Sequence, residues 1–318
     1  MFTIGGIICL LLAGLALESA FHAGHGDDDK SSDDSTPDEE HPAGEHPDGG
    51  PSGETPEGEE GRPSQAGAHL QGSSDGDWLA GTTGDDLIYG GGGRDDIFGN
   101  LGNDTIYGGR GDDWVHGDGA YGPGGHDLIY GGAGNDMLAG DGGNDTIYGG
   151  PGNDTLFGGA GDDKIFGGRG RDTIYGGDGN DTLVAGPGES DLNGGEGNDL
   201  LIGNRGPERA WLHGGPGRDT LVAHAGDFAE GGEDEDLFVL MPDSHHNPPV
   251  VGDYTPGVDR IEIRVEGDPR GPVPKLHFEQ DDDGMTVIHV DGVAVARLQG
   301  GPVIDPRDLF VTRIRRAA

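Results

Sequence analysis

A nine-residue repeat constrains the fold of this chain more than any other feature. From Gly72 onward the pattern Gly-Gly-x-Gly-x-Asp-x-aliphatic-x recurs in tandem, as in the unit GGPGNDTLF at residues 149–157. Sixteen nine-residue units can be placed, and a five-residue insertion at 117–121 interrupts them once. Two irregular units occupy 203–213 and 223–230. A short tandem period predicts a solenoid in which every unit forms the same small structural element.

Each position of the unit has a physical role. Glycines at positions 1, 2 and 4 permit positive φ and close approach of the backbone, so the first six residues are predicted to form a tight turn. Positions 7–9 predict a three-residue strand whose central side chain points inward, because strand side chains alternate between faces. Position 8 is aliphatic in almost every unit, from Leu79 to Leu201. Two units are therefore expected to close one coil, and stacked coils to form two parallel sheets around a thin aliphatic core.

Position 6 is aspartate in nearly every unit. Stacking would bring the aspartates of units n and n+2 to a spacing of about 4.8 Å. A column of charged carboxylates at that spacing repels itself unless cations lie within it. Ca²⁺ suits such a column because it accepts oxygen ligands from carboxylates and backbone carbonyls, and glycine turns expose carbonyls. The candidate metal ligands are Asp77, Asp86, Asp95, Asp104, Asp113, Asp127, Asp136, Asp145, Asp154, Asp163, Asp172, Asp181, Asp199, Asp219 and Asp236.

These tandem units resemble the GGxGxDxUx motif of RTX (repeats-in-toxin) proteins, which form a hemolysin-type calcium-binding β-roll. The resemblance covers residues 72–239, about half of the chain. It implies Ca²⁺ between successive turns, held by the position-6 carboxylates and by carbonyls of the turn residues. It also implies a roll that folds only when calcium is present. The export signal of RTX proteins is normally C-terminal.

Pairing each aspartate with the one two units later predicts the number of sites. The odd-numbered units give an odd column from Asp77 to Asp172, and the even-numbered units give an even column from Asp86 to Asp199. The eleven resulting pairs predict roughly ten calcium ions. The insertion puts the pairs 104–127 and 113–136 in doubt. Ser190 replaces an aspartate and is expected to end the odd column, and fewer sites are expected beyond Leu201.

Composition follows the repeat. The chain has 60 acidic and 19 basic side chains, a net charge of −41, and residues 72–239 contain 49 of its 69 glycines. A surface poor in Lys and Arg argues against nucleic acid as a partner and against docking on an anionic membrane. The single cysteine excludes an intramolecular disulfide and a cysteine-rich metal site.

The N-terminal part differs from the repeat. Residues 2–17 are almost entirely apolar. This length is near the lower limit for a membrane-spanning helix, about 17–25 residues, and is long for a signal-peptide core of about 7–15 residues. We expect residues 1–21 to be either an uncleaved transmembrane anchor or a signal peptide, and either places the remainder outside the cytoplasm, secreted or attached to the cell envelope. Residues 22–71 are acidic and rich in Pro, Gly and Ser, which predicts a disordered spacer.

The remaining residues, 240–318, predict a small β cap over the open end of the roll. The sequence pattern predicts strands at residues 259–265, 275–280, 285–290 and 293–298, and Asp291-Gly292 is a hairpin turn signal. Overall we expect an all-β chain: a right-handed parallel β-roll (β-solenoid) with a C-terminal β cap and a disordered acidic N-terminal segment.

Aromatic side chains at position 9 predict a ladder along one sheet, formed by Tyr89, Tyr107, Tyr130, Tyr148 and Phe166. Stacked rings stabilise a sheet, and the alternative is a partner or glycan surface. A broken threonine column at position 7 argues against a flat ice-binding array.

The HExxH motif, which is typical of zinc proteases, does not occur in the sequence. The GxSxG pattern of lipases is matched only by GSSDG at residues 72–76, which lies in the glycine turn of the first repeat unit. The sequence therefore predicts a monomeric, non-enzymatic calcium-binding protein without catalytic residues or organic cofactor. Two alternatives stay open: a calcium-dependent surface-adhesion or glycan-binding module, and a degenerate secreted enzyme with a minimal site in the cap.

Overall fold

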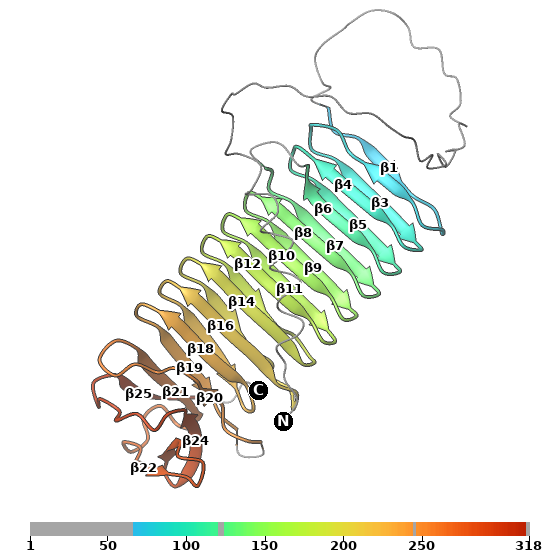
Figure 1. Ribbon diagram of the computed structural model, residues 1–318. Coiled ribbons are helices and arrows are strands. Elements are labelled where there is room, and N and C mark those ends of the chain that lie inside the picture. Colours follow the sequence, from blue (N-terminus) through green and yellow to red (C-terminus); the bar gives the residue numbers. More distant parts are fainter. Residues whose placement is uncertain (1–65, 120–123, 244–245, 316–318) are drawn as a thin grey trace, which may run out of the picture. The chain divides into compact units, whose positions relative to one another are not determined.

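The structure is a computed structural model that describes residues 66–119, 124–243 and 246–315. In these ranges every regular element is a β-strand, and the strands form two sheets that run along the roll (Figure 1). All strand pairs are parallel except two antiparallel pairs within residues 276–298. From residue 69 to residue 266 successive strands alternate between the two sheets, so each strand pairs with the strand two elements before it. This topology confirms the parallel β-solenoid that the repeat predicted.

Sheet A has twelve strands and sheet B has thirteen. Sheet A contains, in spatial order, β1 (His69–Gln71), β3 (Leu87–Gly92), β5 (Thr105–Arg110), β7 (Leu128–Ala133), β9 (Thr146–Pro151), β11 (Lys164–Arg169), β13 (Thr182–Val184), β15 (Leu200–Ile202), β17 (Thr220–His224), β19 (Leu237–Met241), β21 (Arg260–Glu266) and β25 (Leu309–Ile314). Sheet B contains β2 (Trp78–Ala80), β4 (Asp96–Asn100), β6 (Trp114–Asp118), β8 (Met137–Gly142), β10 (Thr155–Ala160), β12 (Thr173–Asp178), β14 (Ser190–Glu196), β16 (Ala210–Pro216), β18 (Phe228–Glu233), β20 (Val250–Val251), β24 (Val293–Leu298), β23 (Thr286–Val290) and β22 (Leu276–Gln280).

Most strands are longer than the three residues predicted. β5, for example, runs for six residues and keeps its register with β3 through the glycine pair Gly109 and Gly91. The prediction was wrong because it assigned the first glycines wholly to the turn. A ladder needs only backbone N–H and C=O groups, so glycines can extend it.

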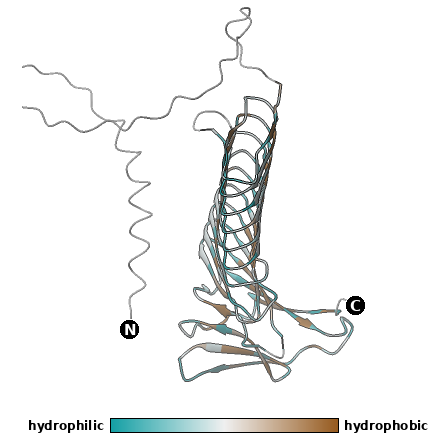
Figure 2. Ribbon diagram, turned by 90° about the vertical axis from the view of Figure 1, so that its right-hand side faces the viewer, coloured by the Kyte–Doolittle hydropathy of each residue, from teal (hydrophilic) through white to brown (hydrophobic). Residues whose placement is uncertain are grey.

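A single column of aliphatic side chains from each sheet fills the roll. The position-8 residues from Ile88 to Leu201 are fully buried, as predicted, while Leu79 near the N-terminal end is only partly buried. Figure 2 shows the described strands of each sheet stacked one above another around this narrow interior. The core is one aliphatic layer thick, so it buries little apolar surface per residue.

The predicted aromatic ladder is present on the outer face of sheet A. Consecutive rings from Tyr89 to Phe166 lie with centroids 4.8–4.9 Å apart and planes within 7° of parallel. All five rings are half-buried. Each interior ring therefore has both of its faces covered by its neighbours in the ladder.

The C-terminal residues continue both sheets of the roll. β21 and β25 extend sheet A, whereas β24, β23 and β22 extend sheet B beyond the short strand β20. The predicted hairpin is confirmed, because Asp291 and Gly292 adopt positive φ (52° and 87°) between antiparallel β23 and β24. β25 was not predicted. It pairs in parallel with β21, far from any hairpin signal.

The N-terminal predictions fall mostly on residues outside the described ranges, including the anchor or signal at 1–21 and most of the spacer. One part of the spacer was predicted wrongly. Residues 69–71 form β1, which pairs with Leu87–Tyr89, and Leu70 packs against the core. In the described ranges no helix is long and apolar enough to span a membrane.

Candidate functional site

The position-6 aspartates are the principal buried polar side chains of the roll. Fourteen of the fifteen predicted residues are at most 3% exposed, and Asp77 in the first turn is half-buried. Each lies directly before a strand, so odd-column residues precede sheet B strands and even-column residues precede sheet A strands. The fold thus places two columns of carboxylates along the two edges of the roll.

Within each column, one carboxylate oxygen binds the backbone of the preceding coil. The backbone nitrogen of Asp145, for example, donates to Oδ1 of Asp163 at 2.7 Å. The odd column contains the linked pairs 77–95, 95–113, 113–136, 136–154 and 154–172. The even column contains 86–104, 104–127, 127–145, 145–163, 163–181, 181–199, 199–219, 219–236 and 236–259. All eleven predicted pairs are therefore neighbours in the structure.

The second carboxylate oxygen has no hydrogen-bond partner in most of these residues. A buried acceptor without a partner is costly and rare in native proteins. The orphaned atoms are the Oδ2 oxygens of Asp95, Asp104, Asp113, Asp127, Asp136, Asp145, Asp154, Asp163, Asp172, Asp181, Asp199 and Asp219. Their repetition along two edges indicates one shared missing partner.

The first glycine of each turn leaves space beside this oxygen. A Cβ added to Gly149 would lie 2.6 Å from Oδ2 of Asp154 and 2.5 Å from the carbonyl oxygen of Gly167 in the next coil. The same arrangement recurs at Gly90, where the added atom would meet Asp95 and the carbonyl of Gly108. Glycine is required here because any side chain would fill a space bordered by oxygen atoms from two coils.

At the two ends of the roll, the Oδ2 atoms of the column aspartates accept hydrogen bonds from the backbone. In the first two turns, Ser73 and Thr82 donate backbone N–H groups to the Oδ2 atoms of Asp77 and Asp86. At the other end Thr255 donates to Oδ2 of Asp259 at 2.6 Å. The orphaned oxygens are therefore confined to the interior coils.

Burial raises the pKa of the column carboxyls in the interior coils, because the charged form loses water when it enters the turn. The pKa of Asp127 is raised to about 8, and those of Asp104 and Asp145 are raised to about 7. In the odd column, the pKa of Asp136 and that of Asp154 are raised to about 6. The hydrogen bond from the preceding coil lowers the pKa in each case, but the loss of water outweighs it. A cation beside these carboxylates would compensate their buried negative charge.

The five-residue insertion does not break either column. The pairs 104–127 and 113–136, which the sequence placed in doubt, are linked at 2.8 and 2.9 Å. Asp118 in the insertion is buried, and its carboxylate accepts backbone N–H groups from Gly125 and Gly142. Asp118, which the repeat pattern did not identify, therefore links the described part of the insertion to Gly125 and Gly142.

The odd column is interrupted at Ser190, as predicted, but it does not end there. Ser190 is buried with an orphaned Oγ, and Ala210 takes the equivalent position one coil later. Asp227 then resumes the column and accepts from Ala210 and His224 at 2.8 Å each. The sequence analysis missed Asp227 because it lies in an irregular unit, although its Gly-Asp pair was a usable signal.

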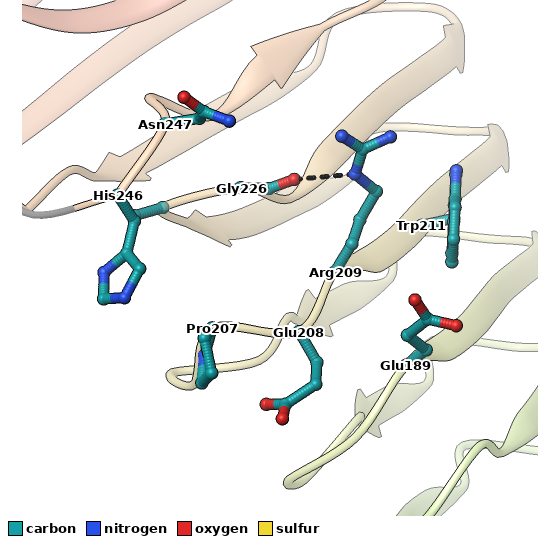
Figure 3. A pocket seen from close by; sticks show the side chains of 9 residues that line it. Glu189, Pro207, Glu208, Arg209, Trp211, Gly226, His246 and Asn247 are labelled. Atoms are coloured by element: carbon teal, nitrogen blue, oxygen red, sulfur yellow. Dashed lines mark hydrogen bonds between the residues drawn. The ribbon is translucent and has the colours of Figure 1, made fainter.

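Side chains join the turns where the odd column lacks aspartate. Arg209 donates from Nε to the carbonyl oxygen of Gly226 at 3.0 Å, and its guanidinium lies 5.7 Å from the centroid of the Trp211 ring (Figure 3). Asn204 donates to the carbonyl of Gly188 at 2.8 Å. Arg209 and Trp211 border an open groove of about 700 Å³. At this edge the guanidinium of Arg209 joins neighbouring turns.

The even column continues beyond Leu201, where fewer sites were expected. Asp199, Asp219 and Asp236 are linked in sequence, and Asp236 donates its backbone N–H to Asp259 in the cap at 3.1 Å. Asp253 of the cap accepts from Gly231 and Gly232. The irregular units therefore interrupt only the odd column of aspartates.

Position 5 forms a second ladder that the sequence analysis did not identify. Side-chain oxygens at this position accept the backbone N–H of position 5 in the next coil, as when Asn198 donates to Asn180 at 3.0 Å. Asn103 and Asn144 accept in the same way from His126 and Asp162. The frequency of Asn and Asp at this position was the available signal. These side chains are exposed and connect coils without a metal.

The donors available for a metal are oxygens. In the described ranges no three His, Cys, Asp or Glu side chains gather into a metal-holding group. A metal between two coils would therefore take a few carboxylate oxygens together with backbone carbonyls, which is the ligand set of Ca²⁺. The orphaned Oδ2 atoms, the glycine space and the raised pKa values all fit that ion.

Comparison with known proteins was made on the chain as a whole. No curated protein matches it. Among solved structures it is similar to a hyperactive, Ca²⁺-dependent, β-helical antifreeze protein from an Antarctic bacterium, with 22% identity over 63% of this chain and 74% of the other, and a TM-score of 0.30.

A family model for the RTX calcium-binding nonapeptide repeat matches several overlapping segments. They are residues 71–106, 93–120, 121–156, 139–174, 148–183, 157–192, 175–207 and 210–237. Together they cover just over half of the chain and include all fifteen predicted aspartates. By its repeats and its roll, the chain belongs to the RTX family of calcium-binding nonapeptide-repeat proteins.

Proposed function

We propose that this chain is a non-enzymatic, extracytoplasmic calcium-binding protein whose roll folds when roughly ten Ca²⁺ bind between its turns. The observation that carries the proposal is the set of twelve buried Oδ2 atoms without partners. The interior sites would take Oδ2 atoms of the column aspartates together with carbonyl oxygens of the glycine turns. Bound Ca²⁺ supplies the positive charge that the two carboxylate columns lack.

Folding is proposed to depend on this charge. The roll between residues 72 and 239 contains 32 acidic and 8 basic side chains, and its core is one aliphatic layer thick. Metal-binding free energy then becomes folding free energy, because the sites exist only in the stacked coils. The dissociation constants of extracellular calcium modules, about 10⁻⁴–10⁻³ M, suit a protein that stays unfolded until export.

A structural role for the cap supports the non-enzymatic interpretation. Its charged side chains form ion pairs, including Arg297 with Asp281 at 2.6 Å and Arg313 with Asp291 at 2.9 Å. Tyr254, which follows β20, donates to Asp308, which precedes β25, at 3.0 Å. The closed stacking of the tyrosine ladder likewise favours a role in sheet stability.

The test is far-UV circular dichroism of the full chain during a calcium titration at neutral pH, with reversal by chelator. We expect a cooperative gain of β signal that excess chelator removes and that Mg²⁺ at the same concentration does not produce. Isothermal titration then counts the bound ions. A full β signal in excess chelator would contradict the proposal.

A further inference from the structure

The outer face of sheet B carries an exposed aromatic surface near the N-terminal end of the roll. Its members are Trp78, Phe98, Trp114, His116 and Met137, on β2, β4, β6 and β8, and we call this surface the tryptophan platform. Trp78 is 70% exposed, Trp114 41% and Met137 46%. Exposure of this degree is unusual for large apolar side chains that lie together.

Register explains why these side chains share a face. Trp78, Asp96, Trp114 and Met137 occupy position 7 of successive sheet B strands and are aligned in the parallel ladder. Phe98 and His116 occupy position 9 and stack with their ring planes 4° apart. Trp78 contacts Phe98 at 6.3 Å and Trp114 contacts His116 at 5.5 Å, centroid to centroid. The rings therefore form one connected surface.

The two ladders differ in what their ring faces can do. On sheet A the tyrosines lie on adjacent strands and cover one another. On sheet B the strand of Asp96 separates the two tryptophans. Two strand spacings amount to about 10 Å, so the indoles do not stack on each other. Neither indole is covered by the other, both are exposed, and the Asp96 strand lies between them.

From this geometry we infer that the tryptophan platform binds a neutral β-linked polysaccharide. One face of a pyranose ring presents C–H groups that pack on an aromatic ring, while its hydroxyls donate to a carboxylate such as Asp96. Two indoles about 10 Å apart match the length of a disaccharide, so each would take every second sugar. The net charge of −41 disfavours an anionic glycan.

The size of the surface favours a glycan over a second protein. With roughly 200–250 Å² for each large side chain, the exposed fractions of Trp78, Trp114 and Met137 give about 300–400 Å² of apolar surface. A stable protein interface needs about 800 Å² on each partner. Face-to-face pairing of two copies would also bring the two Asp96 carboxylates together.

The experiment uses the full chain in calcium and three kinds of probe. Microcrystalline cellulose and chitin serve for pull-down, and a soluble mixed-linkage β-glucan serves for titration by tryptophan fluorescence. The chain has three tryptophans, and Trp211 lies elsewhere on the roll, so Trp211→Ala is a matched control. Tyr107→Ala tests the sheet A ladder in parallel.

We expect binding to at least one neutral polysaccharide, with a tenfold or greater loss of affinity in Trp78→Ala and in Trp114→Ala. Trp211→Ala and Tyr107→Ala should retain the parent's affinity, and Trp78→Ala should retain the parent's calcium midpoint for folding. Hyaluronan should not bind. Chelator should abolish binding, because the platform is assembled from four stacked strands.

Several results would overturn the inference. Absence of binding to every neutral polysaccharide would do so, as would binding that both tryptophan variants retain. Sedimentation that shows a dimer lost in Trp78→Ala would identify a second copy as the occupant. Platform-dependent binding to phosphatidylcholine vesicles alone would identify a lipid surface. None of these outcomes bears on calcium binding, which the dichroism titration tests separately.

Discussion

The backbone nitrogen of Asp136 donates to Oδ1 of Asp154 at 2.9 Å, while Oδ2 of the same Asp154 carboxylate is buried without a partner. One oxygen thus joins two coils, and the other faces a space that glycine keeps open. Repeated along both edges, this arrangement couples backbone stacking to cation binding. Loss of the cation leaves buried negative charge next to the bond that holds the coils together.

Substitution of Asp154 should weaken the roll in proportion to the oxygens lost. Asp154→Ala removes both the acceptor for Asp136 and one orphaned oxygen, so we expect the calcium midpoint for folding to rise several-fold. Asp154→Asn keeps one carbonyl oxygen and should give a smaller rise. Dichroism titrations measure both. Asp178→Ala removes the same charge from an exposed position and should leave the midpoint unchanged; an equal rise in that control would show a general charge effect.

Calcium affinity should fall as the pH falls, because protons compete for the same carboxyls. Burial raises the pKa of the carboxyls in the interior coils from 3.8, to about 8 for Asp127 and about 6 for Asp136. The metal-free roll then binds more protons than the unfolded chain, so the contribution of these groups to its stability is greatest below about pH 4 and is lost as the pH rises through about 8. Titrations at pH 8 and pH 5 should show the calcium midpoint rise at least about tenfold at the lower pH. A midpoint independent of pH would contradict the assignment of these carboxyls.

Ser190→Asp should repair the interruption in the odd column. The Ser190 Oγ is buried and orphaned at a position where every preceding coil of this column has a carboxylate. In calcium we expect about one additional ion by isothermal titration. Ser190→Asn serves as the uncharged control, and an unchanged ion count would place Ser190 outside any site.

Alanine substitutions should show which glycines the backbone conformation requires and which can be replaced at little cost in stability. Gly150 has a φ of 113°, and a Cβ there would lie 2.2 Å from the carbonyl oxygen of Gly132. Gly150→Ala should therefore cost about 2 kcal/mol or more. At Gly92 the nearest atom to an added Cβ is 3.7 Å away. Gly92→Ala should change stability by about 1 kcal/mol at most. Chemical denaturation in saturating calcium measures both, and equal effects would show that the turn does not depend on the left-handed glycine.

The tyrosine ladder should contribute to stability through ring stacking. Tyr130 stacks on Tyr107 and Tyr148, whereas Phe166 stacks on Tyr148 at the end of the series. We expect Tyr130→Ala to cost about 2–3 kcal/mol and Phe166→Ala about half of that, from lost pair contacts and buried area. Denaturation at fixed calcium tests this order. A ladder that serves only as a ligand surface would show no such difference.

Much of the roll follows from local rules in the sequence. The nine-residue period indicates which residues are inward, which are turns and which are two coils apart, and Ile147 and Leu156 are fully buried accordingly. The strand ends were less predictable. Whether Gly109 belongs to a turn or a ladder depends on a backbone partner in another coil, which the residue itself does not specify.

Features that lie outside the nine-residue repeat were harder to infer from the sequence. Asp227 and Asp259 enter the columns from irregular segments, because stacking brings their carboxylates to the backbone N–H groups of Ala210 and Asp236. β25 completes sheet A by pairing with β21, with the whole hairpin of the cap between them in the chain. Such contacts have no short-range signature, so a pattern of nine residues cannot reveal them.

The sequence alone determined the repeat, the inward aliphatic column, the two carboxylate columns and the chemical class of the ion that fits them. These are consequences of periodicity, since one unit dictates the geometry of all. Tertiary structure decided which oxygen of each aspartate is satisfied and which is orphaned. It also showed that the rings of the tyrosine ladder stack on one another while Trp78 and Trp114 are exposed, because ring exposure depends on which side chain occupies the neighbouring strand.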